Sequence, residues 1–103
     1  MALVKVAETH EIPEGKSKRV LIKRQPIAIF NCEGTYYAID DTCSHADASL
    51  AEGEVLRDKC QVACPLHGAR FDIKTGQALS LPAVSPVETY KVTVDGTAIM
   101  VEV

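Results

Sequence analysis

Two short motifs bring together side chains that bind transition metals. Cys43-Ser44-His45 contains a thiol and an imidazole, and so does Cys64-Pro65-Leu66-His67, with eighteen residues between His45 and Cys64. Each pair is spaced so that a single loop can direct both side chains toward one site. One cysteine and one histidine in each loop match a cluster of two irons and two sulfides, in which two thiolates bind one iron and two imidazoles bind the other.

Three other interpretations of these four residues stay open on spacing alone. A mononuclear zinc site is chemically possible, although structural zinc sites more often pair like ligands, as C-x₂₋₄-C and H-x₃₋₅-H. A catalytic cysteine–histidine pair would leave two of the four residues unexplained. Chance placement is the third alternative.

The remaining cysteines and the third histidine lack this pattern. In a reducing compartment, cysteines are more often metal ligands, redox groups or small buried hydrophobes than disulfides. Cys32 and Cys60 lie in or near strand-like runs, with no histidine at ligand spacing. We therefore predict that both are small buried hydrophobic residues and not ligands. His10 is predicted to be exposed at the end of a strand.

The elements that must position the motifs are strands. Alternating or continuous apolar patterns predict strands over residues 3–6, 19–23, 26–31, 35–39, 87–94 and 98–103. The run from 26 to 31 is apolar enough to be buried on both faces. Glu33-Gly34 predicts a hairpin turn, and Asp95-Gly96 predicts a two-residue turn between the last two strands.

The stretch from about residue 40 to residue 86, called the insertion below, differs from these β-rich ends. It holds both Cys/His motifs, and its one helical candidate is a turn over residues 46–52, too short to be stable alone. The pattern predicts an all-β fold with an antiparallel β-sandwich base and a loop-rich cluster-binding subdomain. Residues 1–103 are predicted to form a single domain.

Composition excludes several classes of function. The 103 residues carry a formal net charge of −3, and no run of Lys or Arg forms a basic stripe, which argues against a nucleic-acid partner. No apolar run approaches the roughly 20 residues that a membrane helix needs. Nothing at the N-terminus resembles a signal peptide. We therefore expect a cytoplasmic protein with no membrane partner.

The sequences around the motifs carry a family resemblance. The stretches 41–45 and 64–72 strongly resemble the two cluster loops of Rieske proteins. The whole chain resembles the small ferredoxins of bacterial dioxygenase systems that hydroxylate aromatic rings. The resemblance implies a Rieske fold with one [2Fe–2S] cluster, in which Cys43 and Cys64 bind the inner iron and His45 and His67 bind the outer iron.

Substitutions within the second loop predict a low reduction potential. High-potential Rieske proteins of respiratory complexes carry an extra cysteine in each loop, and here Leu66 occupies one of those places. Ala69 and Phe71 stand where those proteins have a hydroxyl donor and a tyrosine. Fewer hydrogen bonds to cluster sulfur destabilise the reduced form. We expect Gly68 to allow a tight turn that directs amide groups at sulfide, and residues 81–86 to form a loop that shields the cluster.

The resemblance implies a one-electron carrier that is not itself an enzyme. It would pass electrons from a flavin-dependent ferredoxin reductase to a terminal Rieske non-haem iron oxygenase, which selects the aromatic substrate. Both partners are expected to dock transiently over the tip formed by His45 and His67, and a monomer is expected. Two alternatives are the small Rieske subunit of a reductase complex, such as assimilatory nitrite reductase, and a zinc-stabilised interaction module.

Overall fold

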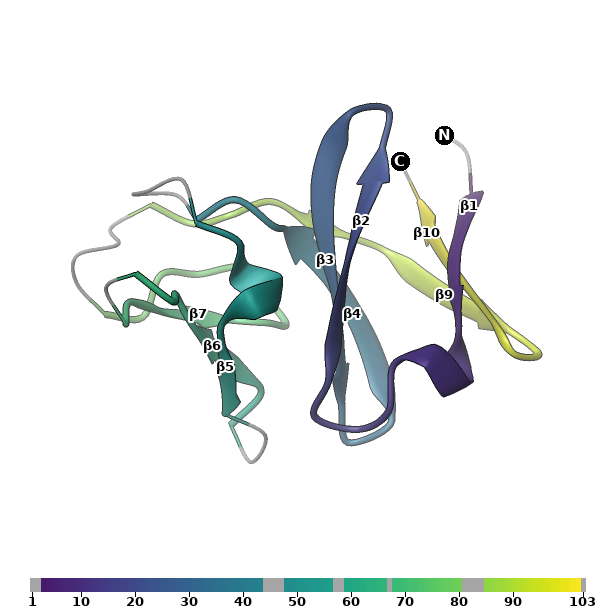
Figure 1. The fold of residues 1–103 in the computed structure, drawn as a ribbon, viewed down its shortest axis with the longest axis horizontal. Coiled ribbons are helices and arrows are strands. Elements are labelled where there is room, and N and C mark those ends of the chain that lie inside the picture. The colour runs from purple at the N-terminus through teal and green to yellow at the C-terminus, as the bar shows by residue number, and fades with distance from the viewer. Residues whose placement is uncertain (1–2, 44–47, 57–58, 67, 81–84, 103) are drawn as a thin grey trace.

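The computed structural model describes residues 3–43, 48–56, 59–66, 68–80 and 85–102, and antiparallel strands dominate them (Figure 1). The strands are β1 Leu3–Glu8, β2 Ser17–Ile22, β3 Gln25–Cys32, β4 Thr35–Asp40, β5 Glu54–Leu56, β6 Gln61–Ala63, β7 Arg70–Asp72, β8 Thr89–Tyr90, β9 Val92–Asp95 and β10 Ala98–Glu102. Two short 3₁₀ helices are present, η1 Thr9–Glu11 and η2 Leu50–Glu52. The all-β prediction is confirmed. The described residues include no helix with the length and hydropathy of a membrane span.

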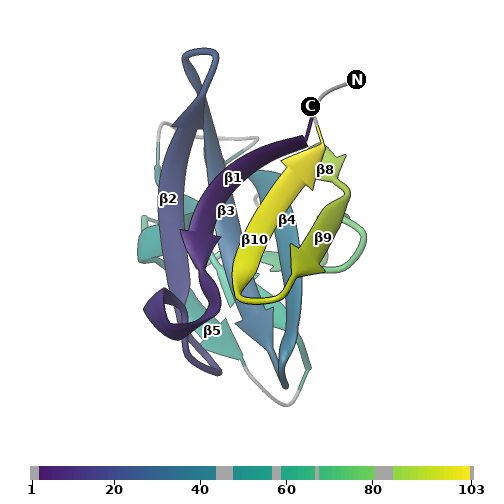
Figure 2. The same ribbon diagram turned by 90° about the vertical axis from the view of Figure 1, so that its right-hand side faces the viewer.

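The base consists of two packed sheets. One has the strand order β1-β10-β9 and the other has the order β2-β3-β4-β8 (Figure 2). Ile27 and Ile29 of β3 and Ile99 and Val101 of β10 are fully buried between them. Burying such side chains away from water provides most of the favourable energy of folding.

Strand β3 lies between two hydrophobic cores and contributes side chains to both. Because side chains alternate along a strand, Ile27 and Ile29 face the core of the base, whereas Ala28, Phe30 and Cys32 belong to a second core. The last six residues of β3 are all buried, which confirms that this strand is buried on both faces.

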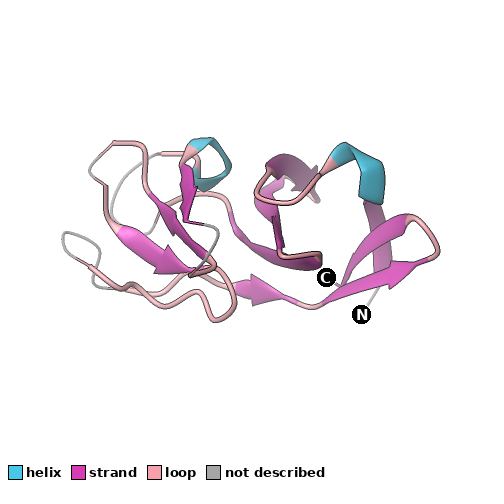
Figure 3. Cartoon of the chain, turned by 90° about the horizontal axis from the view of Figure 1, so that it is seen from below, coloured by secondary structure: helices cyan, strands magenta, loops and turns pink. Residues whose placement is uncertain are grey.

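The second core lies on the other face of β3, where the insertion packs against this strand. A sheet of order β5-β6-β7 lies beside the base (Figures 1 and 3), and Phe71 of β7 and Leu50 of η2 are fully buried in the same core as Phe30. The sequence predicted loops here and missed these three strands. Each has only three residues, too few for a period of two to be recognised. Of the helical turn predicted over residues 46–52, only Leu50–Glu52 form a helix, η2, among the described residues.

The predicted strand over residues 87–94 is two strands. β8 pairs with β4, and β9 pairs with β10, so the chain changes sheets at Lys91. A continuous alternating pattern does not show such a crossing. The final turn is also displaced by one residue, because Asp95 pairs with Ala98 and leaves Gly96 and Thr97 as the loop. The φ of Gly96 is 63°, which suits the first position of such a turn.

The chain leaves the base at β4 and returns beside it at β8. The Asp40 amide donates to the Glu88 carbonyl at 2.9 Å, and the Tyr90 hydroxyl donates to Asp40 Oδ1 at 2.7 Å. Burial and then the hydrogen bond to Asp40 raise the pKa of the Tyr90 phenol, so it remains a donor throughout the physiological pH range. These two hydrogen bonds therefore join the two ends of the insertion at the point where it meets the base.

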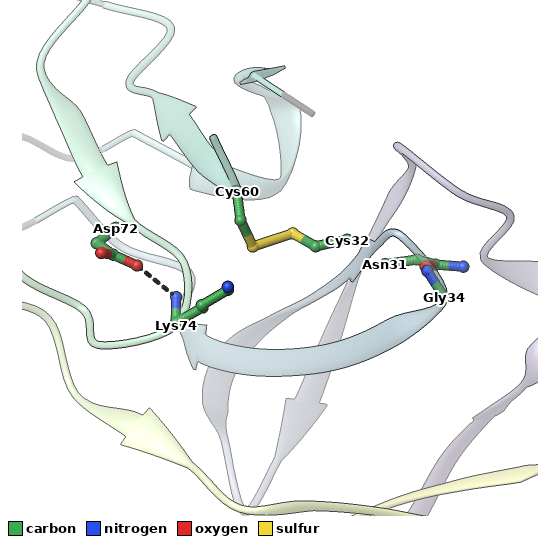
Figure 4. Close-up of a disulfide and its surroundings, with 6 residues drawn as sticks. All are labelled: Asn31, Cys32, Gly34, Cys60, Asp72 and Lys74. Atoms are coloured by element: carbon green, nitrogen blue, oxygen red, sulfur yellow. Dashed lines mark hydrogen bonds between the residues drawn. A yellow bond between two sulfur atoms is a disulfide. The ribbon is translucent and has the colours of Figure 1, made fainter. Parts of the chain in front are cut away.

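A disulfide between Cys32 and Cys60 corrects the prediction for these residues. Both are buried as predicted, but they are bonded to each other, with their Cα atoms 5.7 Å apart (Figure 4). They are 28 residues apart in sequence, and a link of that range leaves no local pattern. Closing a loop of this length restricts the unfolded chain and stabilises a fold by about 3–4 kcal/mol. His10 is exposed in η1, directly after β1, as predicted.

Replacing Tyr90 with Phe tests the joint at the root of the insertion. The variant removes the hydroxyl donor to Asp40 and should lower the free energy of unfolding by about 1 kcal/mol, measured by urea denaturation. Tyr37→Phe is the matched control, since the described residues give its hydroxyl no hydrogen bond. Equal stability of the two variants would contradict a role for this contact.

Candidate metal centre

The two Cys/His motifs lie in loops that close in the same way. Thr42 pairs with Ser49 across the first loop, and Ala63 pairs with Arg70 across the second, so each loop has six residues and begins with its cysteine. The pairing places both cysteines at equivalent positions, one residue beyond the last pair of each hairpin.

A backbone hydrogen bond fixes each of these cysteines. The Cys43 amide donates to the Ala48 carbonyl with an N–O distance of 3.0 Å, and the Cys64 amide donates to the Ala69 carbonyl at 2.7 Å. In both loops the acceptor is the fifth residue after the cysteine. The backbone of each cysteine is thus held by its own loop, whatever its side chain binds.

Both thiols are buried in the second core. The exposed fractions of Cys43 and Cys64 are 3% and 2%, and both residues belong to the same hydrophobic cluster. Neither takes part in the disulfide. His45 and His67 lie outside the described residues, so the structure places half of the predicted ligand set. Two buried thiols at matched positions fit the inner half of a cluster with one end inside the protein.

Comparison with known proteins identifies the family of the chain. The family model of the Rieske [2Fe-2S] domain matches residues 2–91. The chain belongs to the Rieske [2Fe–2S] family. Its cofactor is therefore a Rieske-type [2Fe–2S] cluster, which supplies reversible one-electron transfer when bound.

Individual Rieske proteins resemble the chain over nearly its whole length. The 3-phenylpropionate/cinnamic acid dioxygenase ferredoxin subunit of Shigella boydii serotype 4 (strain Sb227) is 50% identical over 93 residues, which cover 89% of this chain and 85% of that protein. The solved ferredoxin of carbazole 1,9a-dioxygenase from Nocardioides aromaticivorans IC177 has a TM-score of 0.94 and 36% identity, covering 98% and 97% of the two chains.

Two further solved structures extend the comparison. One is a complex of reduced oxygenase and oxidized ferredoxin in carbazole 1,9a-dioxygenase, with a TM-score of 0.89, 32% identity and coverage of 96% and 91%. The other is described as a putative nitrite reductase small subunit, with a TM-score of 0.85, 25% identity and full coverage of both chains. The Rieske fold is shared by all of them.

A buried carboxylate anchors the first cluster loop of this Rieske chain. Asp41 is 2% exposed, and its Oδ1 accepts hydrogen bonds from the Ser49 hydroxyl at 2.8 Å and the Ala51 amide at 2.9 Å. Its Oδ2 accepts from Arg19 Nε at 3.0 Å. The Leu50 amide donates to its carbonyl at 2.7 Å. Asp41 therefore joins both ends of the loop to strand β2.

Sequence reasoning did not assign this anchor. Arg19 pairs with this buried carboxylate, and charges are rarely buried unless paired. An aspartate two residues before Cys43 was a usable signal. The alanine five residues after each cysteine, Ala48 and Ala69, was another.

Gly68 adopts the conformation that the tight turn requires, but its amide has another acceptor. Its φ is 71°, a left-handed value that favours glycine, and a Cβ there would meet nothing within 4 Å. Its N–H donates to the Cys64 carbonyl at 2.8 Å. The expectation that such amides point at sulfide is therefore wrong for Gly68 itself.

The other residues singled out in the second loop divide by burial. Ala69 and Phe71 are fully buried, whereas the Leu66 side chain is 60% exposed. Asp72 Oδ1 accepts the Lys74 amide at 2.8 Å, drawn as the dashed line in Figure 4, and Arg70 is exposed. Residues 81–84 of the predicted shielding loop lie outside the described residues.

Replacing Asp41 with Ala tests the anchor. The change leaves the Ala51 amide, the Ser49 hydroxyl and Arg19 without their acceptor, so we expect unfolding free energy to fall by about 2 kcal/mol. Iron per chain should fall with it. Lys18→Ala, which breaks the exposed pair with Glu11, is the control and should change stability by about 0.5 kcal/mol or less. A fully loaded, equally stable Asp41 variant would contradict the anchor.

Proposed function

We propose that this Rieske ferredoxin passes single electrons from a flavin-dependent ferredoxin reductase to a terminal Rieske non-haem iron oxygenase that degrades aromatic compounds. The observation that carries the proposal is the 50% identity over 93 residues to a dioxygenase ferredoxin subunit. The matched, buried thiols of Cys43 and Cys64 support the electron-carrying part. The chain is the electron-transfer component of such a system and not its catalyst.

The proposed ligands are Cys43 and Cys64 for the inner iron and His45 and His67 for the outer iron. Equivalent positions of the two cysteines in two six-residue loops support one shared cluster. Each histidine follows its cysteine within the same loop, which limits how far it can lie from the metal. Neutral imidazole in place of thiolate leaves the oxidised cluster uncharged and raises its potential above that of four-cysteine clusters.

Partner docking is proposed at the tip of the two loops. Leu66 lies between the two second-loop ligands and is 60% exposed, so its apolar surface is accessible to a partner that docks at this tip. Redox encounters use small interfaces, which allow fast release. The solved complex of a related ferredoxin with its oxygenase supports the oxygenase as one partner.

We propose that residues 1–103 act as one domain, with the cluster-binding part at about 40–86. We also propose that the chain is a monomer and that it works in the cytoplasm. The shared core on both faces of β3 supports a single unit. The alternative of a nitrite reductase small subunit has the weaker support of 25% identity. A zinc module does not agree with the family match.

Replacing Leu66 with Glu tests the docking tip. We expect the rate of electron delivery to a dioxygenase oxygenase to fall roughly tenfold, equivalent to about 1.4 kcal/mol of lost apolar contact, in stopped-flow measurements. Leu21→Glu is the matched control, because that side chain is 62% exposed on β2 of the base. The visible spectrum of the cluster should not change. Equal rates for both variants would refute docking at this tip.

Replacing Ala69 with Ser tests the origin of the predicted low potential. A hydroxyl at this buried position should donate toward cluster sulfur and stabilise the reduced form by about 1 kcal/mol. That energy raises a one-electron potential by roughly 40 mV, measured by voltammetry. Ala7→Ser in the base is the control. A potential that stays at the wild-type value in Ala69→Ser would show that another feature sets it.

A further inference from the structure

The Cys32–Cys60 disulfide joins the base to the insertion. Cys32 is the last residue of β3, and Cys60 is in the turn between β5 and β6 (Figure 4). The covalent loop that it closes contains Cys43 and the whole first cluster loop. On the other side, β6 leads directly from Cys60 to Cys64. The link therefore lies one short strand away from the second cluster loop, whereas the first cluster loop begins beyond the opposite end of β4.

A backbone hydrogen bond at Cys60 also connects the disulfide to the end of β7, the third strand of the insertion. The φ of Cys60 is 51°, and its carbonyl accepts a hydrogen bond from the Ile73 amide at 3.0 Å. Ile73 follows β7 and is fully buried. The turn held by the disulfide thus anchors the ends of β6 and β7 that lie away from the cluster loops.

Solvent reaches the disulfide through a cavity. Cys32 and Cys60 are each 5% exposed and line a cavity of about 190 Å³, whose other lining residues are Glu33, Thr35, Tyr37, Lys59 and Lys74. Two lysines against one glutamate favour a negatively charged thiolate at this place. A positive surrounding assists both the approach of an attacking thiolate and the departure of a cysteine thiolate.

We propose that Cys32–Cys60 is a thiol–disulfide exchange site for a dithiol reductant, and that its redox state sets how firmly the insertion holds the cluster. The inference rests on the proposed cytoplasmic function, because disulfides in that compartment are typically transient or redox-sensing. The disulfide connects no ligand directly. It acts by restricting the opening of β5–β7 away from β3.

The exchange proceeds in two balanced steps. A thiolate of the reductant attacks one sulfur of the pair, the Cys32–Cys60 bond breaks, and the departing cysteine takes a proton. The second thiol of the reductant then breaks the mixed disulfide and releases the other cysteine. Two electrons and two protons pass from the dithiol to the protein. The cluster transfers one electron at a time, whereas reduction of the disulfide needs two. The dithiol, and not the cluster, is therefore the reductant.

Non-covalent contacts keep the insertion folded after reduction. The Ser17 hydroxyl donates to the Ala51 carbonyl at 2.7 Å, the Asp41 anchor remains, and the second core stays packed on β3. We expect a folded protein in which β5–β7 open more often. Opening exposes the inner thiols, so the cluster is lost faster.

The experiment compares the holoprotein with and without dithiothreitol, using wild type and the Cys32→Ala/Cys60→Ala double variant. Alkylation followed by mass spectrometry counts the thiols at positions 32 and 60. Hydrogen exchange measures opening of β6 and β7, and bleaching of the visible absorbance in a chelator measures cluster loss. Reduction should accelerate both, with cluster loss rising roughly tenfold or more. The double variant should behave like the reduced protein and show no response to dithiothreitol.

Several results would overturn the proposal. A disulfide that dithiothreitol does not reduce in the folded holoprotein is not an exchange site. Reduction that changes neither hydrogen exchange nor cluster loss would show that the link does not hold the insertion. An equal response of the double variant would assign the effect to dithiothreitol acting on the cluster. Hydrogen exchange does not depend on electron transfer. Failure of the exchange-site proposal can therefore be distinguished from failure of the proposed electron-carrier function.

Discussion

The structure depends on one constraint, that two loops far apart in sequence must present their first residue to the same buried place. A hydrogen bond from each cysteine amide to the alanine carbonyl five residues later fixes the backbone of that cysteine within its own loop. These hydrogen bonds use only backbone atoms and do not involve the thiols. The short sheet β5-β6-β7 and the shared core then fix the second loop relative to β3.

Strand β3 makes this arrangement possible in a small protein. By burying both faces, it contributes to the base and to the cluster-bearing part at once, so neither needs a complete core of its own. Two features then join the insertion to the base at different points: the buried Asp41 carboxylate and the Cys32–Cys60 disulfide. The pairing of β4 with β8, within the base, holds the two ends of the insertion together.

Sequence patterns predicted the features that depend on residues close together in the sequence. The hairpin from β3 to β4, the two-sided burial of β3 and the ligand motifs all follow from residue type and local spacing. Patterns did not show that the chain changes sheets at Lys91, because alternation continues across the crossing. They also missed the disulfide and the Arg19–Asp41 pair, which join residues 28 and 22 positions apart. Such contacts depend on the tertiary fold.

A low-temperature EPR spectrum of the dithionite-reduced protein, with iron and acid-labile sulfide assayed on the same sample, tests whether the chain binds a histidine-ligated cluster. We expect about two irons and two sulfides per chain and a rhombic signal, with an average g value below that of four-cysteine clusters, because two ligands are histidines. An EPR-silent protein that contains zinc in place of iron would contradict it. So would a cluster signal unchanged when His45 and His67 are both replaced.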